Sequence, residues 1–207
     1  MPLEEEIGKA YRNYLTHLPA DSGDPPPRLY KRAVRMAKSA YLACRFGYGD
    51  LTGQPWRWIL ALPVYLSPLH RPELDRPLSY LTGRKVGRLL DVGCGAGDWL
   101  RLAEKLGWHT EGVDFDPGAV ANARSTGLSV RSGQVADQNF PDRTFDLILM
   151  SHLIEHVHDP VGVLRECHRV LKDDGLLVVW TPNSDGWVHG RFGKNWTGLH
   201  PPYHLWL

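Results

Sequence analysis

Short runs of consecutive apolar residues alternate with helical patterns over the second half of the chain. Each run has the length of a buried strand and is bounded by turn residues. The runs lie at 88–92, 111–114, 129–132, 145–150 and 176–180. Because strands that alternate with helices form parallel sheets, this pattern predicts a doubly wound α/β domain with helices on both faces of a mostly parallel sheet. We place this domain at residues 85–207.

Two of the predicted helices begin with an acidic residue followed by proline. Asp116-Pro117 and Asp159-Pro160 each provide a carboxylate for the helix N-terminus and a proline suited to the first turn. Glycine commonly follows the last turn of a helix. We therefore expect the first of these helices to end near Gly127 and the second to end at Gly175.

Residues 1–84 have a different character, because prolines and aromatic residues are frequent in them. Residues 25–49 contain six basic residues and no acidic one, at a spacing that predicts a basic amphipathic helix over 28–45. We expect a helical N-terminal extension that acts as a lid, with peripheral membrane contact as the alternative role. Residues 56–66 are apolar but too short to span a bilayer, and they suit an interface or an apolar acceptor pocket.

Composition narrows the class of protein. The chain has 207 residues, 43% hydrophobic and 23% charged, which suits one folded domain with an extension. The net charge of +1 gives no global attraction for nucleic acid. The N-terminus has no apolar segment typical of a secretion signal, and Cys44, Cys94 and Cys167 form no C-x-x-C pair. These features predict a cytoplasmic protein, or a membrane-peripheral one if the basic helix binds lipid.

A glycine-rich turn, Gly93-Cys94-Gly95-Ala96-Gly97, joins the strand at 88–92 to a helical pattern. Glycines let the backbone approach a ligand, and the helix N-terminus offers N–H groups to an anion. Asp114 ends the next strand, where a carboxylate can bind ribose hydroxyls. Asp98 stands where a dinucleotide site needs its third glycine, so the spacing disfavours NAD. A turn that only packs tightly and binds nothing is the alternative.

The stretch 90–97 closely resembles the first motif of class I S-adenosylmethionine (SAM) methyltransferases, and 111–117 and 133–146 resemble the motifs that follow it. The resemblance implies a Rossmann-like fold, with SAM as cofactor and S-adenosylhomocysteine as product. Gln134 departs from the usual Asp, although its carbonyl oxygen can still accept from the adenine amino group. The cofactor contacts that follow are Asp91, Gly93, Cys94, Gly95, Gly97, Asp114, Phe115, Gln134, Val135 and Ser151.

Residues 151–160 follow the fourth strand and resemble the same segment of methyltransferases of the ubiquinone-biosynthesis and surface-glycan-cluster types. Ligands of open α/β sheets bind outside the carboxyl ends of the strands, so this segment should face the transferable methyl group. A neutral imidazole can remove a hydroxyl proton near pH 7. We predict His152 and His156 as candidate bases and Glu155 as their orienting partner. The alternative is that Glu155 and His156 only hold the glycine turn or the helix start.

Two further patterns concern the candidate site. His152 to His156 also matches the H-x-x-E-H pattern of zinc proteases, which lies on a helix and needs a further ligand. Because the pattern here follows a buried strand, we expect no metal. Residues 196–205 resemble an acceptor-pocket segment of the surface-glycan relatives, which implies His204 as an acceptor-side base. The alternative is that this segment is an ordering loop.

The resembling family usually has seven strands, and only three residues follow His204. We expect the final strands to be missing and the exposed edge of the fifth strand to favour a homodimer. The predicted function is SAM-dependent O-methylation of a sugar or a lipid-linked glycan precursor. Alternatives are methylation of a quinone-like small molecule and a SAM-binding pseudoenzyme without turnover. A third alternative is an RNA methyltransferase, which only the basic helix supports.

Overall fold

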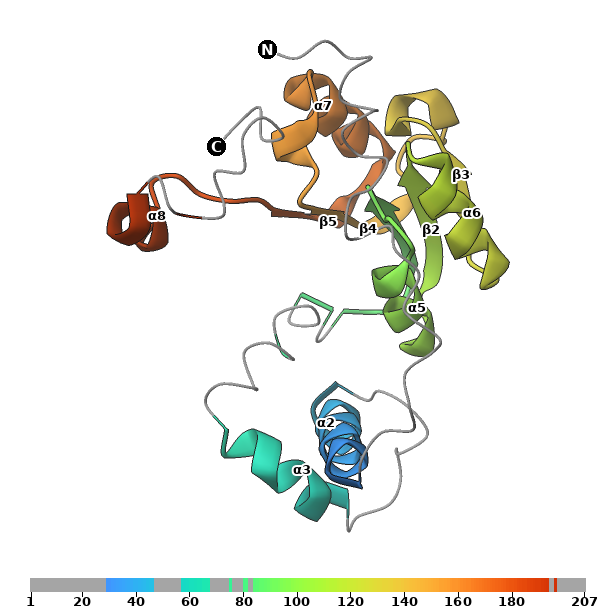
Figure 1. The fold of residues 1–207 in the computed structure, drawn as a ribbon. Coiled ribbons are helices and arrows are strands. Elements are labelled where there is room, and N and C mark those ends of the chain that lie inside the picture. Colours follow the sequence, from blue (N-terminus) through green and yellow to red (C-terminus); the bar gives the residue numbers. More distant parts are fainter. Residues whose placement is uncertain are drawn as a thin grey trace. The chain divides into compact units, whose positions relative to one another are not determined.

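The computed structural model describes residues 29–46, 57–67, 75, 80–81, 84–193 and 196. The chain divides into two compact units (Figure 1). Of the described residues, the larger unit contains 87–104, 108–193 and 196, and the smaller unit contains the remainder, from 29 to 86 together with 105–107. His204 lies outside the described residues.

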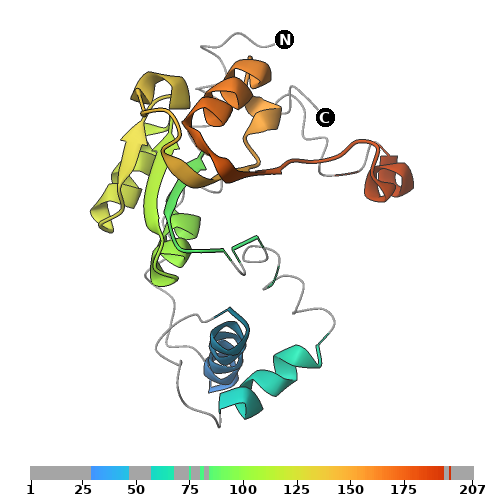
Figure 2. The ribbon, with the colours of Figure 1, turned by 180° about the vertical axis from the view of Figure 1, so that it is seen from behind.

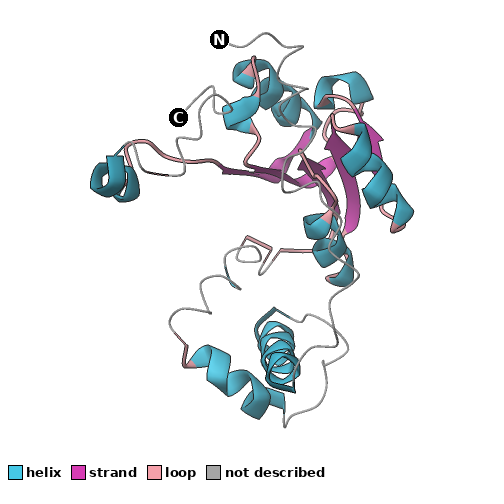
Figure 3. Ribbon diagram, viewed as in Figure 1, coloured by secondary structure: helices cyan, strands magenta, loops and turns pink. Residues whose placement is uncertain are grey.

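The larger unit is built on one parallel sheet, drawn in magenta in Figure 3. Its strands are β1 (Arg88–Val92), β2 (His109–Asp114), β3 (Val130–Ser132), β4 (Phe145–Ser151) and β5 (Leu171–Trp180). Their order in the sheet is β3-β2-β1-β4-β5, and every neighbouring pair is parallel. The chain winds outward from β1 in one direction and then from β4 in the other, so the predicted doubly wound fold is confirmed. The order reverses between β1 and β4, which is where such sheets bind ligands.

Helices cover both faces of this sheet (Figures 1 and 2). They are α5 (Asp98–Lys105), α6 (Pro117–Ser125) and α7 (Pro160–Val170), with short 3-10 helices η2 (Val135–Gln138) and η3 (Ile154–His156). A further helix, α8 (Trp187–Phe192), follows β5, has no buried residue and does not cover the sheet. The predicted caps are confirmed, because Asp116 accepts from the N–H of Gly118 and Asp159 accepts from the N–H of Gly162, both at 2.8 Å.

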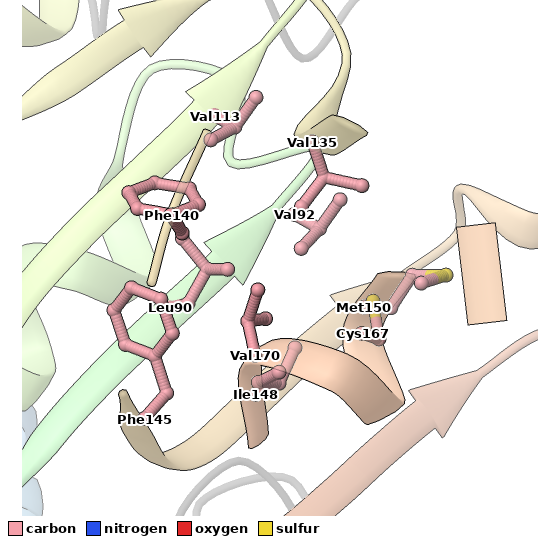
Figure 4. Packing of buried hydrophobic residues seen from close by; sticks show 10 residues of the cluster. All are labelled: Leu90, Val92, Val113, Val135, Phe140, Phe145, Ile148, Met150, Cys167 and Val170. Atoms are coloured by element: carbon pink, nitrogen blue, oxygen red, sulfur yellow. The ribbon is translucent and has the colours of Figure 1, made fainter. Parts of the chain in front are cut away.

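The main core lies between the sheet and α7 with η2 (Figure 4). Alternate residues of β1 and β4 point to this face, as expected from the period of two in a strand. The rings of Phe140 and Phe145 meet edge to face with centroids 5.1 Å apart. The buried cluster consists of Leu90, Val92, Val113, Val135, Phe140, Phe145, Ile148, Met150, Cys167 and Val170.

The predicted end of the last helix at Gly175 is wrong. α7 ends at Val170, and β5 begins at once with Leu171. The backbone N–H of Thr144 donates to the carbonyl of Val170 at 2.7 Å, so the helix end is tied to the segment that enters β4. Pairing of β4 with β5 then shifts from Phe145–Leu171 to Leu147–Leu176, which leaves residues 172–175 as an irregularity within the strand. Gly175 belongs to this irregularity and is not a helix stop.

The smaller unit contains α2 (Leu29–Phe46) and α3 (Arg57–Tyr65), which confirms the helical N-terminal extension. The two helices pack through a cluster that is centred on Ala40, Tyr41, Ala61 and Val64. The rings of Tyr41 and Tyr65 are 4.7 Å apart, and the Tyr41 hydroxyl donates to Asp75. Within the described part of the chain, no helix is both long enough and apolar enough to cross a membrane.

Candidate functional site

The glycine turn lies at the carboxyl ends of β1 and β2. The N–H groups of Gly93 and Cys94 donate to the carbonyl of Val113, at 2.8 and 3.2 Å. Gly93, Gly95 and Gly97 have φ values of 78°, 53° and 78°, a region that side chains with a Cβ rarely adopt. A Cβ on Gly97 would come within 2.3 Å of the Leu128 side chain. The turn therefore needs glycine for its backbone conformation and, at position 97, for space.

Asp114 connects the turn to the segment that follows β2. Its Oδ2 accepts from the N–H of Gly95 at 2.8 Å, and its Oδ1 accepts from the N–H of Asp116 at 2.9 Å. A carboxylate has about four lone-pair sites, so each oxygen of Asp114 can accept a further hydrogen bond. Only 6% of the residue is exposed, which places this acceptor at the edge of the buried interior.

A cavity of about 290 Å³ adjoins this carboxylate, near the lower end of the range for small-molecule sites. The predicted site residues that line it come from four separate segments and are thereby brought together. They are Gly93, Asp114, Phe115, Gln134, Val135 and His156. Phe115 is 41% exposed and offers an apolar ring to the solvent side of the site.

Other predicted cofactor contacts lie beside the cavity and not in its lining. The side chain of Cys94 is buried, and its Sγ lies 2.7 Å from where a Cβ on Gly112 would stand. Burial, together with the charges of Asp91 and Asp114, raises the pKa of the Cys94 thiol. Its side chain therefore packs against β2 as a neutral group. Gly95, Gly97 and Ser151 also lie outside the lining.

Asp91 lies at the penultimate position of β1 and is 3% exposed. Burial first, and the nearby charge of Asp114 second, raise its pKa to about 7. The carboxyl groups of Asp91 and Asp114 thus lie at the ends of the adjacent strands β1 and β2, in surroundings that favour different protonation states. Asp114 accepts backbone N–H groups, whereas Asp91 is held in an environment that favours its neutral form.

Several residues that complete the cavity were not named individually as ligand contacts from the sequence. Half of them belong to the segment 151–160 between β4 and α7, which the rule that ligands bind at strand carboxyl ends indicated only as a whole. Asp159, for example, was predicted only as a helix cap. The additional lining residues are Val92, Val113, Gly133, Leu153, Val157, His158, Asp159 and Val163.

His152 and Glu155 form a pair just after β4. The Nδ1 atom of His152 lies 3.2 Å from Oε1 of Glu155, and the His152 side chain is 65% exposed while that of Glu155 has no exposed surface. His152 has a φ of 52°, and its N–H donates to the carbonyl of Trp180 at 2.7 Å. The strained backbone and this bond hold the imidazole beside the carboxylate.

The pair shifts both pKa values. The hydrogen bond that His152 donates to Glu155 raises the pKa of His152, burial opposes that shift, and the charge of Glu155 adds to it. For Glu155, burial acts to raise the pKa, but the His152 bond, the residue's own backbone and the charges of His156 and His152 outweigh it. The pKa of Glu155 is therefore lowered. Its Oε2 has no hydrogen-bond partner within the described residues.

The H-x-x-E-H pattern does not lie on an α-helix here, because His152 follows β4 directly and only Ile154 to His156 form the short η3. Among the residues that the structure describes, no group of three or more His, Cys, Asp or Glu side chains is arranged to hold a metal ion.

Comparisons with known sequences concern most of the chain. A family model described as a methyltransferase domain matches residues 69–207. A probable S-adenosylmethionine-dependent methyltransferase of Mycobacterium tuberculosis is 32% identical over 181 residues, which are 86% of this chain and 61% of that protein. A ubiquinone biosynthesis O-methyltransferase of Actinobacillus pleuropneumoniae is 32% identical over 133 residues, 58% of this chain and 56% of that protein. The chain thus spans less than two thirds of the length of these curated relatives.

Solved structures give the same picture of the fold. A SAM-dependent methyltransferase from Archaeoglobus fulgidus has a TM-score of 0.54 at 22% identity, over 73% of this chain and 67% of that chain. The YcgJ protein from Bacillus subtilis has a TM-score of 0.50 at 27% identity, over 63% and 61% of the two chains. Both likenesses agree with a parallel sheet that carries helices on its two faces.

Proposed function

Because the chain belongs to the methyltransferase domain family, we propose that it transfers a methyl group from SAM to a hydroxyl group of a small or lipid-linked acceptor. The preferred acceptor is a sugar or a lipid-linked glycan precursor. A quinone-like phenol is the second candidate, which the ubiquinone O-methyltransferase among the relatives favours.

The site fits the cofactor, and the bonding of Asp114 is the observation that carries the proposal. Its two oxygens already fix the turn and retain lone pairs toward the cavity. Asp114 would accept hydrogen bonds from ribose hydroxyls, Gln134 would accept from the adenine amino group, and Phe115 would contact the base. When bound, SAM supplies an electrophilic methyl group on a positively charged sulfur atom.

His152 is the residue we assign to the acceptor hydroxyl. A hydrogen on Nδ1 that is donated to Glu155 leaves Nε2 free to accept a proton from that hydroxyl. The buried carboxylate then stabilises the imidazolium that forms, so Glu155 acts as a positioning residue. His156 lines the cavity and is the alternative base. His204 remains a predicted acceptor-side base from the sequence resemblance alone.

Calorimetric titration with SAM, S-adenosylhomocysteine and NAD tests the cofactor assignment. We expect micromolar binding of the first two and none of NAD. Asp114→Asn should weaken SAM binding at least about tenfold, because an amide has one accepting oxygen where the carboxylate uses two. The matched control is Asp116→Asn, whose side chain can still cap α6. Binding of NAD, or equal losses in both variants, would overturn the assignment.

A radiolabelled-methyl assay tests the acceptor. Methyl-tritiated SAM is incubated with a polyprenyl-linked sugar, a sugar nucleotide, a catechol-type quinol and transfer RNA. Incorporation into either sugar supports the preferred acceptor, and incorporation into the quinol alone supports the second candidate. Incorporation into RNA alone would refute both acceptors. SAM binding without any incorporation would favour a pseudoenzyme.

A further inference from the structure

The face of α3 that is not packed on α2 consists of apolar side chains. Ala61 and Val64 are buried against α2, whereas the side chains on the other arc of the helix reach solvent. These exposed residues, at 42% to 74% exposure, are Trp58, Ile59, Leu62 and Leu66, which directly follows the helix. A solvent-facing helix normally places polar residues on its outer arc, so an arc composed of Trp, Ile and Leu requires a partner.

The helix that packs on α3 is strongly basic. α2 contains Lys31, Arg32, Arg35, Lys38 and Arg45 and no acidic residue. Arg45 is paired with Asp75 at 3.1 Å, and Arg32 is exposed. The smaller unit therefore combines an apolar face with an excess of positive charge, and this combination is typical of helices that lie in the surface of an anionic membrane.

We propose that α3 lies in the boundary between headgroups and acyl chains of an anionic bilayer, with the basic residues of α2 at the headgroups. The helix has nine residues, so it suits a position in the plane of the interface and not across the bilayer. Trp58 belongs to a residue type that concentrates at this depth. The proposal does not depend on the proposed methyl transfer.

Vesicle flotation of the full chain tests the proposal. Vesicles of equal parts phosphatidylcholine and phosphatidylglycerol should bind the protein, and pure phosphatidylcholine vesicles should bind it at least about tenfold more weakly. Leu62→Glu should reduce binding to the mixed vesicles by about tenfold or more, because it places a charge on the inserted face. The matched control is Val161→Glu, a 52% exposed apolar residue on α7, which should leave flotation unchanged.

A conservative variant keeps the test independent of folding. Brominated acyl chains should quench part of the native tryptophan fluorescence, and Trp58→Phe should remove the greater share of that quenching. Absence of flotation, equal flotation of Leu62→Glu and Val161→Glu, or quenching unaffected by Trp58→Phe would overturn the proposal. So would light scattering that shows a dimer in the native chain and a monomer in Leu62→Glu. Titration of the same variants with SAM measures cofactor binding separately, so a loss of vesicle binding can be distinguished from a failure of the proposed function.

Discussion

The imidazole of His152 reaches the fully buried carboxylate of Glu155 across a single turn of 3-10 helix, with 3.2 Å between Nδ1 and Oε1. An exposed titratable group thus shares a hydrogen bond with a charge that has no access to water. Charge–charge interactions are stronger where water is excluded, so the protonation of His152 depends on Glu155.

Glu155→Gln should lower the pKa of His152, because it removes the negative charge that raises it and leaves only a neutral amide oxygen to accept the hydrogen bond. Resolved imidazole signals in an NMR titration measure this shift directly. Glu166→Gln is the matched control, since Glu166 is paired with Arg169 on α7. A His152 midpoint that is the same in the native chain and Glu155→Gln would contradict the pairing.

The sign of the pH dependence follows from the same pair. The pKa of His152 is raised in the folded chain, so its contribution to the free energy of unfolding is full at low pH and is lost as pH rises through the folded pKa. Methyl transfer should show the opposite trend, rising as Nε2 loses its proton, above the ordinary pKa of histidine. A pH–rate profile that does not move in Glu155→Gln would argue against His152 as the base.

His152→Gln should lower kcat by about two to four orders of magnitude, the usual contribution of a general base, with little change in SAM affinity. His168→Gln is the control, because His168 is an exposed histidine near the end of α7, which meets the amino end of β4 and not its carboxyl end. Steady-state kinetics with a saturating acceptor, together with calorimetry, separate the two effects. Loss of SAM binding in His152→Gln would instead indicate a structural role at the end of β4.

Gly97→Ala should destabilise the larger unit by about 1–3 kcal/mol, because the alanine would have a positive φ and its Cβ would crowd Leu128. Gly127→Ala is the matched variant, with a φ of 89° and no heavy atom within 4 Å of the added Cβ. Urea unfolding of both variants separates backbone strain from crowding. An equal loss in the two would show that Leu128 moves aside without cost.

Asp91 makes a contribution to stability that falls as pH rises. Its folded pKa of about 7 exceeds its ordinary value, so the folded state holds a proton that the unfolded state releases. Between about pH 4 and pH 7 the free energy of unfolding should therefore fall by at most about 1.4 kcal/mol per pH unit from this group. Asp91→Asn should remove that slope in urea titrations. A slope that is identical in the native chain and the variant would contradict the burial argument.

Asp146 is the control for the pH dependence of stability, because its pKa is shifted in the opposite direction from that of Asp91. Burial acts to raise its pKa, but the hydrogen bond from Lys172 and the N–H of Arg88 outweigh this, so the pKa is lowered. Its contribution to stability is present above the ordinary pKa and is lost as pH falls. Asp146→Asn should therefore change the acid side of the profile, opposite in sign to Asp91→Asn.

Much of the fold was predictable because its signals are local. The caps at Asp116 and Asp159 depend on neighbouring residues alone, and the apolar runs of β1 and β4 can be recognised within five and seven residues. The end of α7 was not predictable from Gly175, because it is fixed by the pairing of β5 with β4, a contact between distant parts of the chain. A local glycine rule carries no information about that register.

In the candidate site, too, the features that depend on neighbouring residues were predictable and those that depend on packing were not. The motif indicates which backbone segments meet, and Asp114, Gln134 and Val135 do line the cavity. It does not indicate where each side chain points, because packing decides that. Cys94 turns toward Gly112 for this reason, and His158 lines the cavity although the segment 151–160 does not mark it individually.

The number of residues in the irregular segment 172–175 of β5 does not affect how the later part of β5 pairs with β4. Pairing resumes at Leu176 and continues to Trp180, whose carbonyl accepts from His152, so the position of the site is set beyond the irregular segment. Asp173 and Asp174 are exposed, and they lie near the amino end of the strand, away from the cavity at its carboxyl end. A fluorophore or affinity tag inserted between them would extend outward into solvent, which makes this segment the natural attachment point for immobilising the chain with its site open.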